Sequence, residues 1–242
     1  MTATFDFSGH AVLVTGGTSG IGLAIARAFR DAGAQVAITG TRAGPGDYDV
    51  DLSGLAYQRA DMADLEALPG LAASFPRLDV LVNNAGTAVR EDPLSETAFE
   101  RTIDINLNSV YRLSHLFRER LKVGPGSIVN IASMTSYFAS PRVPGYGASK
   151  AAVLQLTKTL GALYAQDDIR VNAIAPGWIE TGLTAAIKDV DAISRPIVER
   201  TPMGRWGLPE EIAGTALFLA CNDAAGFVTG VTIPVDGGYS AL

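Results

Sequence analysis

The sequence predicts one α/β domain over residues 1–242, built on a doubly wound parallel sheet of about seven strands with helices on both faces. Two observations lead to this prediction. Short apolar runs without polar alternation, typical of strands covered on both faces, alternate with segments of helical period along the chain. The first such run passes through a glycine-rich turn into a helix, which is the local order of a parallel strand–helix–strand unit. A chain of 242 residues is long enough to bury such a core.

Composition and charge exclude several classes of protein. The 19 Lys and Arg residues against 25 Asp and Glu give a formal net charge of −6, and no basic run predicts a nucleic-acid or anionic-membrane surface. The single cysteine, Cys221, excludes a disulfide framework and argues against a zinc site, and we expect a buried structural thiol and no metal. The N-terminus lacks the features of a signal peptide, and no apolar run reaches the length of a bilayer span. We therefore expect a cytoplasmic protein without a membrane or nucleic-acid partner.

The first strand and its turn form the first candidate site. The apolar run Ala11–Thr15 is followed by the turn Gly16–Gly22 and by a helical pattern that ends at Gly33. Glycines in such a turn let the backbone approach a pyrophosphate, whose negative charge the helix N-terminus favours. A tight strand-to-helix turn without a ligand is the alternative interpretation.

The end of the second strand, Gln35–Thr39, bears on the type of dinucleotide. An acidic residue at this strand end binds the ribose diol of NAD, whereas a nearby cation accommodates the 2′-phosphate of NADP. Gly40 occupies the acidic position here, and the guanidinium of Arg42 suits a phosphate, so the sequence favours NADP over NAD. The alternatives are a solvated Arg42, and repulsion of the phosphate if the three aspartates of the irregular segment 43–57 fold back over the site.

Two further strand ends supply polar side chains. A short strand at Tyr57–Ala60 leads to Asp61, a candidate partner for an adenine amino group, and a short helix is expected over 65–75. The run Leu78–Val82 predicts a buried strand that ends in Asn83–Gly86. The small residues of this motif leave space for a ligand, and its amides can join neighbouring strands.

The stretch from Ser133 to Lys150 carries the most informative chemistry. It follows an apolar strand, Ser127–Ala132, and leads into a helix, on which Tyr146 and Lys150 share one face because they are four residues apart. A neighbouring ammonium lowers the pKa of a phenol from its ordinary value of about 10, so that the phenol can exchange a proton with an alcohol. Ser133, at the end of the preceding strand, can hydrogen-bond the same oxygen. The alternative is an exposed amphipathic pair, since this spacing recurs by chance on many helices.

The remaining elements complete the alternation of strands and helices. Helical period covers 95–117, and Asn106 interrupts an apolar stretch within it. Its amide is a candidate site group, and the alternative is a hydrogen bond to its own helix backbone. The other expected elements are a strand at 168–175 broken by Pro176-Gly177, a substrate lid at 182–205, a helix at 208–219 and a last strand at 228–235.

Taken in order, these motifs resemble the short-chain dehydrogenases/reductases over almost the whole chain. Thr15–Gly22 resembles the cofactor loop of that family, Asn83–Gly86 its sheet-stabilising motif, and Pro176-Gly177 its turn beside the nicotinamide. The resemblance implies a Rossmann-type fold with bound NADP or NAD and a catalytic tetrad at Asn106, Ser133, Tyr146 and Lys150. It implies cofactor contacts from residues in all of these motifs: Gly16, Thr18, Ser19, Gly20, Ile21, Gly22, Thr41, Arg42, Asp61, Met62, Asn83, Ala85, Gly86, Tyr146, Lys150, Pro176, Gly177, Ile179 and Thr181.

The mechanism that this resemblance implies is hydride transfer between the nicotinamide and a ketone or secondary alcohol. Tyr146 would protonate the developing alkoxide, and Ser133 would polarise the carbonyl oxygen. Lys150 would lower the phenol pKa and hold the nicotinamide ribose, while Asn106 would hold a water that relays protons towards Lys150. The backbone of Ile179 and the Thr181 hydroxyl would fix the carboxamide.

A mostly apolar substrate wall predicts a neutral, fairly apolar ketone or alcohol. Beside Ser133 and Tyr146, its members are expected to be Thr135, Phe138, Val143, Trp178 and Leu183, with Met134, Ile187 and Trp206 as further candidates. The resemblance also implies a homotetramer formed through the helices that bear Asn106 and Tyr146. The alternatives are a 3-oxoacyl-carrier-protein reductase, a dehydratase or epimerase, and a non-catalytic dinucleotide-binding sensor or scaffold.

Overall fold

A parallel sheet of seven strands forms the centre of the computed structural model, which describes residues 5–89 and 92–242. The strands are β1 Ala11–Val14, β2 Gln35–Gly40, β3 Ala56–Arg59, β4 Val80–Asn83, β5 Gly126–Ile131, β6 Ile169–Pro176 and β7 Thr232–Val235. Their order is β3-β2-β1-β4-β5-β6-β7, so the chain starts in the middle of the sheet, builds one half, and crosses back to build the other. The predicted doubly wound sheet is confirmed. Ligands bind such sheets beyond the carboxyl ends of the strands, where the order reverses between β1 and β4.

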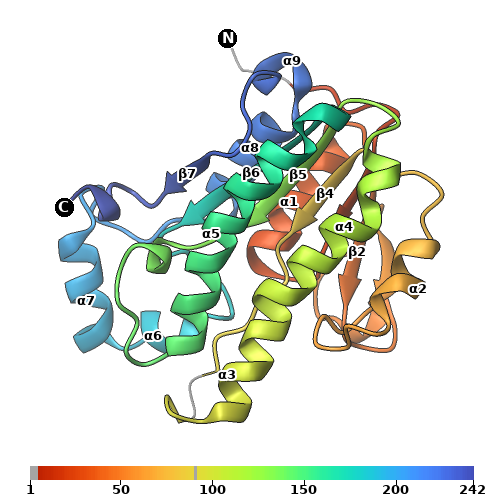
Figure 1. The fold of residues 1–242 in the computed structure, drawn as a ribbon. Helices are drawn as coiled ribbons and strands as arrows, with labels where there is room; N and C mark the ends of the chain where they lie inside the picture. The colour runs from red at the N-terminus through yellow and green to blue at the C-terminus, as the bar shows by residue number, and fades with distance from the viewer. Residues whose placement is uncertain (1–4, 90–91) are drawn as a thin grey trace.

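Helices cover both faces of the sheet (Figure 1). They are α1 Gly20–Asp31, α2 Leu68–Ala73, α3 Glu96–Ile103, α4 Ser109–Leu121, α5 Pro144–Tyr164, α6 Ala185–Lys188, α7 Asp191–Arg200, α8 Pro209–Ala220 and α9 Asn222–Ala225. The side chains of β1 show the two-sided packing: Val12 and Val14 join the core cluster of α1 and α8, whereas Leu13 joins the cluster of α2, α4 and α5. Because both faces of β1 are covered, its four residues are all apolar, which explains a run without polar alternation.

The helical region predicted at 95–117 is divided in three. Between α3 and α4 lies a π-helical turn, Asp104–Asn108, which contains Asn106. The serine at the start, Ser95, caps α3 by accepting a hydrogen bond from the Ala98 N–H at 3.3 Å. Single π-helical turns within α-helices often occur at functional sites, because they re-aim one side chain.

Buried amides join the strands to the helices. The Asn83 amide nitrogen donates to Asn130 Oδ1 on β5 at 2.9 Å and to Ser114 Oγ on α4 at 3.3 Å. Asn130 in turn donates to Thr157 Oγ1 on α5 at 3.0 Å. Asn83 therefore connects β4, β5 and the helical layer, as the amide motif predicted.

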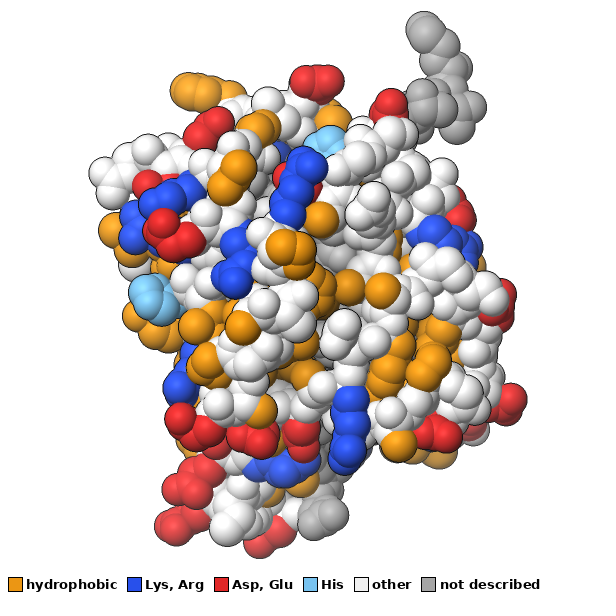
Figure 2. Space-filling view, turned by 90° about the vertical axis from the view of Figure 1, so that its right-hand side faces the viewer, with side chains coloured by type: hydrophobic (Ala, Val, Ile, Leu, Met, Phe, Trp, Pro, Cys, Tyr) orange, Lys and Arg blue, Asp and Glu red, His pale blue; other side chains and the backbone are white. Residues whose placement is uncertain are grey.

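Two other expectations concern the surface and the single cysteine. Cys221 is half-buried at the junction of α8 and α9, rather than buried within a helix, because α8 ends one residue before it. Figure 2 shows acidic and basic side chains interspersed over one face of the molecule. No helix in the described part of the chain is both long and apolar enough to cross a bilayer.

Candidate active site

A cleft of about 410 Å³ opens at the carboxyl ends of β1, β2 and β4, beside the start of α1. Many of the residues predicted to contact a cofactor line it: Gly16, Thr18, Ser19, Gly20, Ile21, Gly22, Thr41, Asp61, Met62, Ala85, Gly86, Tyr146, Lys150 and Thr181. The predicted substrate residue Leu183 also lines this cleft. The sequence reasoning missed several lining residues, among them Asn84, Thr87, Arg101, Ile105 and Gly182, of which only Asn84 belongs to a recognised motif.

The glycine turn fits a dinucleotide because it brings backbone close to backbone. Gly16 has a φ of +63°, and a Cβ there would lie 2.9 Å from the Cα of Ala85. A Cβ on Gly22 would lie 2.4 Å from the Gly16 carbonyl oxygen. Ser19, the N-cap residue of α1, makes no side-chain capping bond, so the first N–H groups of the helix are left for an anion at the cleft. Together these features form a cradle suited to a pyrophosphate.

Tyr146 and Lys150 lie on the cleft wall in the first two turns of α5. The helix starts with Pro144 in its first position, where the missing N–H has no consequence. Lys150 is only 4 % exposed, its Nζ donates to the Ile131 carbonyl oxygen at 2.6 Å, and it lies 5.7 Å from the centre of the Tyr146 ring. Burial lowers the pKa of Lys150 from 10.5 to about 8. This is a buried cation beside a cleft-lining phenol, which excludes the exposed amphipathic pair.

Asn106 reaches the same region from the π-helical turn. Its side chain is fully buried, with Oδ1 accepting from the Thr87 N–H at 2.8 Å and Nδ2 donating to the Thr87 carbonyl at 2.9 Å and to Ser149 Oγ at 3.0 Å. These partners lie outside its own helix. A Cβ on Gly86 would lie 3.4 Å from Asn106 Oδ1 and 3.5 Å from Lys150 Nζ. Gly86 therefore borders two of the four members of the predicted tetrad, Asn106 and Lys150.

Ser133 lies at the end of β5 and starts a short 3₁₀ turn, Met134–Ser136. It is 7 % exposed, and its hydroxyl oxygen accepts from the Thr135 N–H at 3.1 Å. A hydroxyl that accepts this bond keeps its own proton for donation. Val143, another predicted wall residue, is the N-cap of α5.

Phe138 belongs to an aromatic cluster rather than to the lining of the cleft. Its ring and that of Tyr239 meet edge to face, with centroids 6.1 Å apart. The guanidinium of Arg200, on α7, lies 4.9 Å from the Phe138 centroid and 4.3 Å from that of Tyr239. We call these three residues the Arg200 stack. It connects the segment predicted as a lid to the loop after β5 and to the C-terminal segment.

The segment after β6 divides between two cavities. Thr181 lines the cleft, and its Cγ2 lies 3.1 Å from where a Cβ on Gly20 would stand. Trp178 and Ile179, predicted beside the substrate and cofactor, instead line a second cavity of about 400 Å³ next to β7. Gly177 packs there without a side chain, because a Cβ would lie 2.6 Å from the Cα of Asp236.

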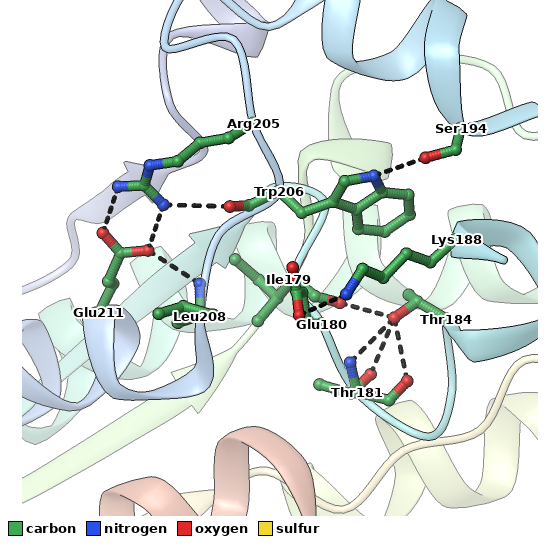
Figure 3. Close-up of polar contacts among 10 residues, drawn as sticks. All are labelled: Ile179, Glu180, Thr181, Thr184, Lys188, Ser194, Arg205, Trp206, Leu208 and Glu211. Atoms are coloured by element: carbon green, nitrogen blue, oxygen red, sulfur yellow. Dashed lines mark hydrogen bonds and ion pairs between the residues drawn. The ribbon is translucent and has the colours of Figure 1, made fainter. Parts of the chain in front are cut away.

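Thr184 holds the backbone that follows β6 (Figure 3). Its hydroxyl donates to the Ile179 carbonyl oxygen at 2.6 Å and lies 3.2 Å from Thr181 Oγ1. Both groups predicted to hold the carboxamide are therefore in contact with Thr184, whose importance the sequence reasoning missed.

Three more contacts fix the predicted lid, 182–205, and the loop after it (Figure 3). Lys188 pairs with Glu180 at 2.5 Å, and the Trp206 indole N–H donates to Ser194 Oγ at 2.9 Å. Arg205 makes a two-pronged pair with Glu211 on α8, at 2.8 and 2.6 Å. The segment is thus attached at both ends and once in its middle.

Of the two arginines near the adenosine end of the cleft, Arg101 lines it and Arg42 does not. Asp61 is exposed, accepts from the Ala63 N–H at 2.9 Å, and faces Arg101 of α3 at 3.9 Å. Arg42 does not line the cleft; it is exposed, stacks over the Tyr48 ring at 4.8 Å and donates to the Asp47 carbonyl oxygen. The three aspartates of the segment 43–57 are exposed.

Comparisons with known proteins agree with this geometry. A family model described as enoyl-(acyl carrier protein) reductase matches residues 16–240. The 2-dehydro-3-deoxy-D-gluconate 5-dehydrogenase of Dickeya dadantii is 38% identical over 251 residues, covering 98% of both chains. The cis-4-hydroxycyclohexanecarboxylate dehydrogenase of Sinomonas cyclohexanicum is 39% identical over 249 residues, again covering 98% of both. A solved structure from Agrobacterium tumefaciens with bound NADP, provisionally named a 2-deoxy-D-gluconate 3-dehydrogenase, is 38% identical over 100% of both chains, with a TM-score of 0.91.

Proposed function

The chain belongs to the short-chain dehydrogenase/reductase family, and we propose that Tyr146 is the general acid/base of its reaction. It is an NAD(P)-dependent oxidoreductase that transfers a hydride between a nicotinamide cofactor and a ketone or secondary alcohol. The observation that carries the proposal is the burial of Lys150 against the Tyr146 ring, on the wall of the cleft that the glycine turn closes.

Tyr146, Lys150, Ser133 and Asn106 have different roles in the transfer of the proton. In reduction, Tyr146 gives its phenolic proton to the developing alkoxide, and the Lys150 ammonium favours the phenolate that remains. Ser133 keeps a hydroxyl proton that it donates to the substrate oxygen. Asn106 holds the Thr87 backbone at the cleft. As part of the proposal, it would also hold a water that relays protons towards Lys150. The bound dinucleotide supplies or accepts the hydride.

Cofactor preference is the second part of the proposal. The cradle fits NADP and NAD alike, and we favour NADP because Gly40 carries no acidic side chain and Arg42 stands near the strand end. The test compares kcat/KM with NADPH and with NADH in wild type and Arg42→Ala. A loss confined to NADPH supports the phosphate contact, and an equal change with both cofactors contradicts it.

The substrate is proposed at the level of a ketone or secondary alcohol. The predicted preference for a neutral, fairly apolar molecule stays a prediction, and the names of both dehydrogenase relatives specify carboxylates. A 3-oxoacyl-carrier-protein substrate is the second candidate, favoured by the description of the matching family model. A screen of neutral ketones, hydroxy acids and 3-oxoacyl thioesters, followed by absorbance of the reduced nicotinamide, distinguishes the three.

Assembly, domain organisation and location are further proposals. The described α3, α4 and α5 each present an exposed ring or aliphatic side chain, with Phe99 42 %, Tyr111 55 % and Leu163 50 % exposed, which supports a homotetramer formed through these helices. Sedimentation velocity tests this assembly. We further propose one domain over 1–242, with 182–205 as a substrate lid, and a cytoplasmic location.

Tyr146→Phe is the decisive experiment for the reaction. The variant lacks only the phenolic hydroxyl, so NADPH binding should persist while ketone reduction falls by about two to four orders of magnitude. Tyr164→Phe, on the same helix and 2 % exposed, is the matched control. Unchanged turnover in Tyr146→Phe contradicts the assigned role. A wild-type protein that binds NADPH but reduces nothing in the screen favours the sensor or scaffold alternative.

A further inference from the structure

We propose that Tyr48 determines dinucleotide choice together with Arg42: its phenol occupies the space that an acidic residue needs at the end of β2, and its ring supports the guanidinium that meets the 2′-phosphate. This inference rests on the proposed NADP site and adds to it a residue from the irregular segment between β2 and β3, which carries no cofactor motif.

The first step is the position of Tyr48 above Gly40. Gly40 is the last residue of β2, is buried and lines the cleft. A Cβ on Gly40 would lie 2.3 Å from the Tyr48 hydroxyl oxygen and 2.7 Å from Thr18 Cγ2. Such distances are far below van der Waals contact, so no side chain fits at Gly40 while Tyr48 stays in place. An aspartate there, the usual partner of the NAD ribose diol, is therefore excluded by packing as well as absent from the sequence.

The second step is that Tyr48 is held in this position by its neighbours. Its hydroxyl accepts a hydrogen bond from the Arg42 N–H at 3.0 Å and lies 3.3 Å from the Tyr57 hydroxyl. Tyr57 donates its proton to the Arg42 carbonyl at 2.5 Å, so the Tyr48 hydroxyl is the donor in the contact between the two phenols. The Tyr48 ring also packs against the core cluster of α1. Both hydrogen-bonding functions of the phenol are used.

The third step connects Tyr48 to Arg42. The Arg42 guanidinium carbon lies 4.8 Å from the Tyr48 ring centroid, within the range of a cation–π contact, and one of its nitrogens donates to the Asp47 carbonyl. An arginine on a ring is already restricted, so less conformational entropy is lost when it binds a phosphate. One residue thus removes the site for NAD-type recognition and prepares the site for the 2′-phosphate.

Binding of two adenosine fragments tests this inference without a substrate. Calorimetry measures the affinities of 2′,5′-ADP, which carries the 2′-phosphate, and of 5′-AMP, which lacks it. In Tyr48→Ala we expect the affinity for 2′,5′-ADP to fall about three- to tenfold, as loss of a cation–π contact predicts, with 5′-AMP affected much less. Tyr48→Phe keeps the ring and should keep the preference. Val50→Ala, in the same segment and 41 % exposed, is the matched control.

A second pair of variants tests the packing argument even if Tyr48→Ala does not fold. Gly40→Ala adds only the Cβ that Tyr48 excludes, so it should lower both the melting temperature and the affinity for 2′,5′-ADP. Gly40→Ala with Tyr48→Phe removes the hydroxyl nearest that Cβ and should recover part of both losses.

The outcomes separate this inference from the proposed function. Equal losses of both fragments in Tyr48→Ala, an unchanged preference for 2′,5′-ADP, or a Gly40→Ala protein that binds and melts like wild type would each overturn it. A wild-type protein that binds neither fragment would overturn the proposed dinucleotide site itself, and the inference with it.

Discussion

Replacing Lys150 by Met separates what the buried ammonium contributes to catalysis from its effect on stability. Burial lowers the pKa of Lys150 from 10.5 to about 8. Charging the amine in the folded protein is therefore unfavourable by about 3 kcal/mol below pH 8 relative to the unfolded chain. Met fills a similar volume without a charge, but it leaves the Ile131 carbonyl without the bond that Lys150 Nζ donates at 2.6 Å, which costs about 1–3 kcal/mol. At pH 7 we expect the variant to be as stable as wild type or up to about 2 kcal/mol more stable.

The pH dependence of the free energy of unfolding gives the sharper measurement. The cost of the lost hydrogen bond to Ile131 is the same at both pH values, so it cancels when they are compared. Between pH 8 and 10.5 the unfolded Lys150 still binds a proton that the folded one has released, so wild-type stability rises with pH across this window. Relative to Lys150→Met, wild type should gain about 2 kcal/mol between pH 7 and pH 9.5. Urea unfolding without dinucleotide at both pH values measures this gain. Lys158→Met, at an exposed position on the same helix, is the matched control. Parallel pH profiles for wild type and Lys150→Met would refute the depressed pKa, whereas activity should be lost in this variant in either case.

Three further predictions follow from packing. In Gly22→Ala the added Cβ would lie 2.4 Å from the Gly16 carbonyl oxygen, so we expect about 1–3 kcal/mol of destabilisation and loss of NADPH binding. Urea unfolding measures the first effect and titration of NADPH fluorescence the second. Wild-type values in both assays would contradict the assignment of the glycine turn as the pyrophosphate site. Arg200→Ala removes the cation from the Arg200 stack and should raise the substrate KM about three- to tenfold without changing the affinity for NADPH. Arg200→Lys should have an intermediate KM. Equal KM values in wild type and Arg200→Ala would show that the stack does not position the lid. Asn130→Ala removes the acceptor of the buried Asn83 amide, which keeps only its bond to Ser114 Oγ, and the donor to Thr157 Oγ1. Urea unfolding should therefore show a loss of about 1–3 kcal/mol in the free energy of unfolding, and a loss below about 1 kcal/mol would contradict the buried network.

The sequence was sufficient for the features that depend on local order. Unalternated runs such as Val12–Val14 indicate strands buried on both faces, and their alternation with helical segments leaves a doubly wound parallel sheet as the consistent arrangement. The glycine turn after β1 and the four-residue spacing of Tyr146 and Lys150 could also be recognised from the sequence alone. In each case the geometry is set within one turn or one helix, so residues close in sequence are close in space.

The contacts that tune the site were decided only by the tertiary structure. Thr87 pairs with Asn106, and Phe138 joins the Arg200 stack from a position predicted for the substrate wall. Tyr48 lies over Gly40 from a segment with no periodic pattern. Each contact joins residues from different elements, whose approach depends on loop conformation and on how helices pack across the sheet. The periodicity of the sequence specifies which face of a helix or strand is buried. Which residues of other elements pack against that face is determined by the packing of the whole chain.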